Sequence, residues 1–61
     1  MAKWKHTVHL FGGESVVLYG DSQRLATKDY GGELFFSGRD GEVVLTVAVI
    51  AVEYIETEVV E

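Results

Sequence analysis

Apolar side chains dominate residues 42–60, and most of the segment is β-branched. Such side chains are stiff at χ1 and fit the pleated surface of a sheet better than a helix. Both alternating phases of the run are apolar: one holds Val43, Leu45, Val47 and Val49, and the other holds Val44, Ala48, Ile50 and Val52. A strand with one solvent-exposed face alternates apolar and polar residues. This pattern therefore predicts a segment that is covered on both faces.

The run is far longer than a usual strand of about 5–6 residues. We therefore predict a strand from residue 42 to about residue 49, a bend or single 3₁₀ turn at 48–51, and a last strand over 52–60. Along that last strand the alternation points one set inward, Ile55, Thr57 and Val59, and another outward, Glu56 and Glu58. The alternative is one long, strongly bent strand shared by two sheets or two subunits.

The rest of the chain predicts three further strands, at residues 3–11, 14–19 and 33–37. Glycine pairs or Asp-Gly mark the tight turns, because glycine adopts positive φ at no steric cost. These turns are expected at Gly12-Gly13 and at residues 38–41. Between the second and third strands we predict a short helical turn over residues 23–26. Asp21 or Ser22 would cap it, Leu25 would anchor it inward, and Gly31-Gly32 would end the connection.

Five short strands, tight hairpins and one helical turn indicate an all-β fold over a single domain, residues 1–61. The expected form is a small five-stranded SH3-like or Sm-like barrel, or a strongly bent antiparallel sheet. The order of elements resembles small uncharacterised phage or prophage proteins of this barrel type. The residues that carry the resemblance are Val8, Leu10, Gly13, Glu14, Leu18, Leu25 and the closing Val52-Glu53-Tyr54-Ile55-Glu56.

This resemblance implies a phage-encoded module that binds a host protein or a small ligand. The nucleotide-binding signatures of the Sm family have no counterpart in the chain, so RNA binding does not carry over.

The chain is close to the smallest size at which a single core suffices, since it has 61 residues. It contains no cysteine, so disulfides cannot stabilise the fold. Self-association is the remaining common way for so small a domain to gain stability. We expect a homo-oligomer. Phe35-Phe36 places one ring on each face of its strand, and the expected interface residues are Phe35, Leu45, Val47 and Val49.

Charge is distributed unevenly around the net value of −5. Residues 1–30 carry four basic and three acidic side chains, a net +1, whereas residues 31–61 carry one basic and seven acidic side chains, a net −6. Binding to duplex nucleic acid normally needs a basic surplus, so we expect none. The acidic end discourages aggregation as a solvated edge strand, mimics nucleic acid or docks on a basic protein. The acidic last strand and the basic first strand carry opposite charges, and if they lie side by side, Lys3 and Lys5 partly neutralise Glu56 and Glu58. With neither an apolar leader nor a membrane-length apolar run, the protein is expected to be cytoplasmic and not membrane-bound.

Candidate chemistry is sparse, and the sequence predicts no enzyme, no cofactor and no metal site. His6 and His9 lie three apart on a strand and face opposite sides, so they cannot share a metal ion. We interpret such strand histidines as surface or rim residues. None of the serines lies in a nucleophile motif, and the glycine pairs lack phosphate-loop spacing.

One cluster of aromatic and basic residues suggests a ligand or partner site: Trp4, Lys5, His6, Tyr19 and Tyr30. Stacking on the rings and charge on the lysine would suit a small anionic ligand. The simpler interpretation is that Trp4 closes one end of a small core. Two functions stay open: a self-associating interaction module, and a binder of nucleotides or single-stranded nucleic acid.

Overall fold

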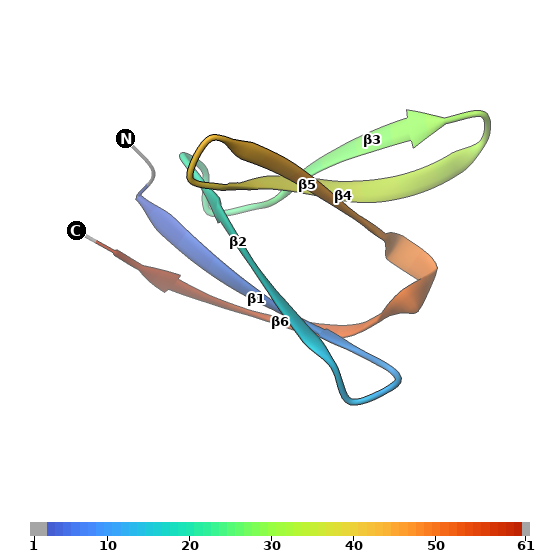
Figure 1. Ribbon diagram of the computed structural model, residues 1–61, viewed down its shortest axis with the longest axis horizontal. Helices are drawn as coiled ribbons and strands as arrows, with labels where there is room; N and C mark the ends of the chain where they lie inside the picture. The colour runs from blue at the N-terminus through green and yellow to red at the C-terminus, as the bar shows by residue number, and fades with distance from the viewer. Residues whose placement is uncertain (1–2, 61) are drawn as a thin grey trace.

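The computed structural model describes residues 3–60 and forms an antiparallel sheet of six strands with one 3₁₀ turn (Figure 1). In chain order the elements are β1 (Trp4–Leu10), β2 (Ser15–Gly20), β3 (Ala26–Tyr30), β4 (Glu33–Asp40), β5 (Val43–Ala48), η1 (Val49–Ala51) and β6 (Val52–Val59). Across residues 3–60 no helix has the length and apolarity needed to span a bilayer.

Strand β4 is the centre of one half of the sheet. The strand order is β3-β4-β2-β1-β6, and β5 also pairs with β4. Arg39 of β4 pairs with both Tyr19 of β2 and Val44 of β5, so these two strands lie on opposite edges of β4. Strands β3 and β5 both pair with residues 35–37 of β4, so they too lie on its opposite edges. Strands β2 and β3 therefore follow one another along the same edge of β4.

The connection between β2 and β3 is looped out of that shared edge. Tyr19 faces Arg39, and Ala26 already faces Ser37 two residues along β4. Residues 21–25 therefore leave the sheet and return almost at the point of departure. Ser37 of β4 is buried, although Arg39, two residues further along the strand, is exposed. Leu25 and Ser37 are among the residues that line a hollow between the loop and β4.

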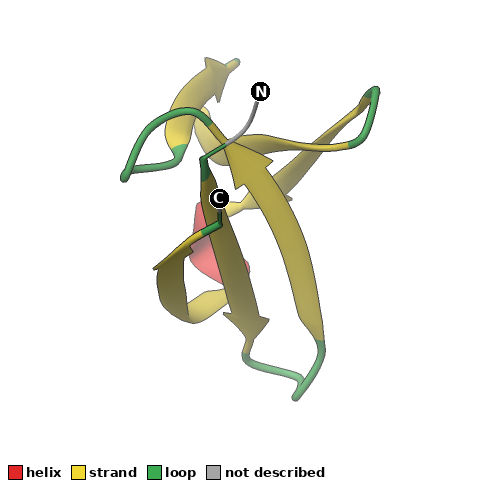
Figure 2. Ribbon diagram, turned by 90° about the vertical axis from the view of Figure 1, so that its left-hand side faces the viewer, coloured by secondary structure: helices red, strands yellow, loops and turns green. Residues whose placement is uncertain are grey.

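The sheet folds over so that β3, β4 and β5 cross the layer made by β2, β1 and β6 (Figure 1). The chain passes from β5 to β6 at η1, drawn red in Figure 2. Val8 and Leu18 are fully buried between the layers, together with the imidazole of His6. Gly38 lies against Leu18, because a Cβ built at Gly38 would stand 2.6 Å from the Leu18 Cβ. The core is thus very small, with much of the remaining apolar surface only half-covered.

The sheet does not close into a barrel. Strands β3 and β6 stand at its two ends, and β5 has a neighbour only in β4, so each of the three has one unpaired edge. The strongly bent antiparallel sheet is therefore the observed form, and the closed five-stranded barrel is not.

Several local predictions are confirmed. The predicted 3₁₀ turn at 48–51 is found at Val49–Ala51, and it divides the long apolar run into β5 and β6. Ile55 and Thr57 pair with Val8 and His6, and Val59 pairs with Trp4, which puts all three on the predicted inward phase. The acidic last strand lies beside the basic first strand, as the charge pattern suggested.

Three local predictions are wrong. Residues 21–24 form bends and no helical turn, although Leu25 is half-buried as expected. The five residues of β3 were not recognised as a strand, and Gly31-Gly32 forms the hairpin turn between β3 and β4 with φ of 65° and 92°. Gly38 lies within β4 and not in a turn, because the space beside Leu18 admits no side chain.

Candidate functional site

The five residues predicted to form a ligand or partner site do not share one surface. Trp4 and His6 lie on the inward face of β1, whereas Lys5 lies on the outward face opposite Tyr19. Tyr30 stands at the tip of the β3–β4 hairpin, at the far end of the molecule from the start of β1 (Figure 1). Their assignment to a binding site stays a prediction, and Trp4 and Tyr30 do not line a common surface.

His6 is a buried residue and not a surface or rim residue, with 1% of its surface exposed. Its Nε2 lies 3.1 Å from the carbonyl oxygen of Ser22, and its Nδ1 lies 3.0 Å from the Thr57 hydroxyl oxygen. Because a carbonyl can only accept, Nε2–H is the donor, and in the neutral ring Nδ1 accepts from the Thr57 hydroxyl. His6 therefore ties together β1, β6 and the loop over residues 21–25.

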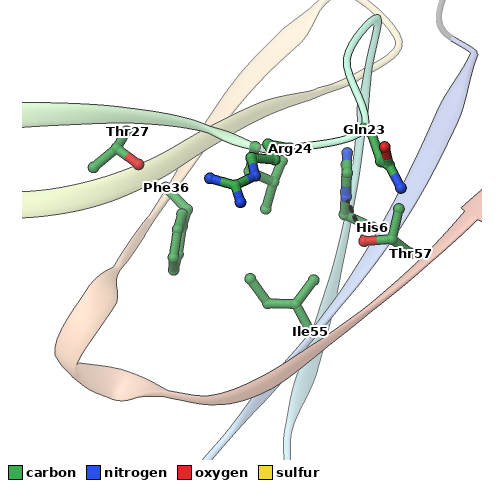
Figure 3. A pocket seen from close by; sticks show the side chains of 8 residues that line it. His6, Gln23, Arg24, Thr27, Phe36, Ile55 and Thr57 are labelled. Carbon is green, nitrogen blue, oxygen red and sulfur yellow. Dashed lines mark hydrogen bonds between the residues drawn. The ribbon is translucent and has the colours of Figure 1, made fainter.

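A hollow of about 280 Å³ lies between β3 and β6, where the sheet does not close (Figure 3). Arg24 and Leu25 of the loop, Phe36 of β4 and Ile55 of β6 contribute to its wall. His6 also lines it, but both ring nitrogens already have protein partners. The hollow thus offers a mixed wall, with apolar side chains, one guanidinium and the polar side chains of Gln23, Thr27 and Thr57, and its imidazole already bonds to protein groups.

His9 lies on the opposite face of β1, as its spacing from His6 predicted. Its Nε2 is 2.7 Å from a carboxylate oxygen of Glu56, and its ring stacks on Tyr54 with centroids 4.3 Å apart. Ser15 stands opposite His9 across the β1–β2 pair. In the part of the chain that the structure describes, no hydrogen bond joins Ser15 to the imidazole of His9. Ser15 therefore lacks the contact that activates a serine as a nucleophile.

The outward face of β1 and β6 also carries charged side chains, but they do not form a metal site within residues 3–60. The Nζ of Lys5 lies 3.9 Å from a carboxylate oxygen of Glu58, which is the predicted pairing of the first and last strands. At this distance and exposure the pair contributes at most about 1 kcal/mol. Within residues 3–60 no three histidine, aspartate or glutamate side chains are grouped closely enough to hold one metal ion.

A shallow hollow of about 300 Å³ on the outward face of β4 brings together one aromatic and two basic residues. Tyr19, Lys28 and Arg39 line it, with Asp21 and Val44 beside them. This is the place in the fold that best suits the alternative of nucleotide or single-stranded nucleic-acid binding. The carboxylate of Asp21 opposes such a ligand, and that alternative stays a prediction.

The residues predicted to form a subunit interface are all half-buried in the single chain: Phe35, Leu45, Val47 and Val49. The most exposed apolar side chains of this region are others, namely Ile50 at 85%, Val43 at 58% and Val44 at 54%. The prediction of a segment covered on both faces is therefore not met within one chain. These three residues were not among those predicted for the interface, and the interface itself stays a prediction.

A signal for this surface was present in the sequence. Between Glu42 and Glu53 the chain holds no charged residue, so the whole of β5 lacks the charges that normally protect an edge strand. The length of the uncharged run, more than its alternation, marks this exposed surface.

Comparison with protein-family models, with curated proteins and with solved structures finds no match for this chain. The resemblance to phage proteins of SH3-like type therefore gains no support from known relatives.

Proposed function

We propose that this protein is a non-enzymatic interaction module that works as a homo-oligomer and presents its remaining surface to a partner protein or a small ligand. The observation that carries the proposal is the uncovered apolar surface at β5 and η1. Two apolar residues are fully buried in the described chain, whereas Val43, Val44 and Ile50 are each more than half exposed. An exposed apolar patch on a small protein commonly marks an interaction surface.

The total accessible surface supports the same proposal. It is 4434 Å² for a 6.7 kDa chain, whereas size scaling gives about 3,900 Å² for a folded monomer of this mass. The excess of about 500 Å² is more than half of the roughly 800 Å² that each partner buries in a standard interface. A chain this open gains stability by covering that surface with another protein surface.

We further propose that the sheet is an open form of the SH3-like fold and that the protein is phage-encoded. The pairing of the first strand with the last, and the 3₁₀ turn between β5 and β6, support the first part. The acidic excess on β6 favours binding over catalysis, and His9 bonds to Glu56 with no hydrogen bond to Ser15 in the part of the chain that the structure describes.

Native mass spectrometry of the purified protein tests the proposed function. We expect a principal species of twice 6.7 kDa at micromolar concentration, because self-pairing covers the apolar surface on both copies at once. Dilution should shift the population toward the 6.7 kDa species, and any bound small ligand would add its mass. A single 6.7 kDa species throughout the micromolar range would contradict self-association.

A further inference from the structure

Three strands of the described chain, β3, β5 and β6, have one edge with no partner strand, and these three edges differ sharply in charge. The exposed β3 strand carries Lys28 and Asp29 at its centre, and β6 carries Glu53, Glu56 and Glu58. The sequence of β5 is Val-Val-Leu-Thr-Val-Ala, with no charge and no proline. Natural sheets protect free edges with charges, proline or bulges, so an unprotected edge is a template for another strand. Of the three edges, β5 is the one suited to pairing.

We propose that the free edge of β5 pairs antiparallel with β5 of a second copy, about a two-fold axis perpendicular to the sheet. This inference rests on the proposed self-association and names its surface. The pairing joins the β3–β4–β5 halves of two molecules into one continuous sheet through backbone hydrogen bonds. Because β5 sits at the edge of its own sheet, the pairing requires no rearrangement within either copy.

Antiparallel pairing also covers the exposed apolar residues, because they lie at the two ends of β5. Val43 and Val44 begin the strand, and Ile50 lies two residues after its end, in η1. In an antiparallel pair the start of one strand lies beside the end of the other, so each valine pair approaches the partner's η1. An apolar hollow of about 250 Å³ lies at that end, lined in part by Leu34, Val49 and Ile50.

The symmetry fixes which residues meet near the axis. A two-fold axis perpendicular to a sheet keeps each face on its own side, so one residue of the strand must oppose its own counterpart. At the middle of β5 that residue is Leu45 or Thr46. Thr46 is exposed and its neighbours across the sheet are Ser37 and Ala26, so a substitution there disturbs little within one copy.

The test replaces Thr46 by lysine and compares the dimerisation constants of variant and parent by native mass spectrometry and light scattering over a dilution series. Two lysines brought together near the axis repel, and we expect a dimerisation constant at least about a hundredfold weaker. Thr27→Lys on β3 is the matched control, because it makes the same change on another exposed edge strand. We expect that control to dimerise like the parent.

Each outcome decides one of the two claims. A dimeric parent with a dimeric Thr46→Lys variant overturns the β5 interface and leaves self-association standing. A monomeric parent overturns both. If Thr46→Lys does not fold, Thr46→Cys replaces it, since the chain has no cysteine of its own. Oxidation by diamide should then link the two copies by a disulfide, faster than in Thr27→Cys, and equal rates would overturn the interface.

Discussion

Replacing Gly38 by alanine is expected to lower the free energy of unfolding by about 2 kcal/mol, within the usual range for an overpacked core. The added Cβ would lie 2.6 Å from the Cβ of Leu18, and Leu18 is fully buried. A Cβ is fixed to its own backbone and cannot swing aside, so β2 and β4 would have to separate. Urea unfolding followed by circular dichroism measures the loss.

Gly12→Ala is the matched control for Gly38→Ala. A Cβ at Gly12 meets no atom within 4 Å, and Gly12 does not have the positive φ of its neighbour Gly13. Both variants must be measured at one protein concentration, because self-association makes apparent stability depend on it. Equal stability of the two variants would show that β2 and β4 do not approach as closely at Gly38 as the structure has them.

Replacing His6 by alanine is expected to cost about 3 kcal/mol, from the cavity left in the core and from two lost hydrogen bonds. The change also releases the loop over residues 21–25, because the bond from His6 to the Ser22 carbonyl is removed. Trypsin cleavage after the exposed Arg24 should then accelerate markedly. Thermal unfolding and limited proteolysis measure the two effects separately.

His9→Ala provides the control on the same strand and the opposite face. The pair of His9 with Glu56 lies at the surface, and its loss is expected to cost less than about 1 kcal/mol. Tryptic cleavage after Arg24 should be unchanged, since His9 does not contact the loop. Comparable losses of stability in the two histidine variants would contradict the structural role given to His6.

The strands that bury a face were predictable, and the one that buries none was not. The first strand, the last strand and the turn at Val49–Ala51 follow from β-branched residues, alternation and the limit on strand length. Strand β3 reads Ala-Thr-Lys-Asp-Tyr, and all five residues are exposed, so it carries no alternation of apolar and polar positions. Its pairing with β4 is a backbone interaction, which side-chain patterns do not record.

The errors at single residues have a similar cause, because they depend on contacts between distant parts of the chain. Gly38 stands next to Arg39-Asp40-Gly41 and resembles a turn glycine until Leu18 of another strand is placed beside it. His6 resembles an ordinary strand histidine until Thr57 and the Ser22 carbonyl supply its two partners. Alternation also does not reveal which strand will stand at an edge of the sheet, so the free edge of β5 was not predicted.

Hydrogen–deuterium exchange of the unmodified protein, resolved by residue with NMR at several concentrations, tests pairing through the β5 edge most directly. Alternate backbone amides of Val43–Ala48 point away from β4 and exchange freely in a single copy. We predict that these amides become protected as concentration rises, while the free-edge amides of β3 stay unprotected. Rapid exchange of the free-edge β5 amides at every concentration at which the protein is dimeric, or protection that rises at β3 or β6 instead, would contradict the account.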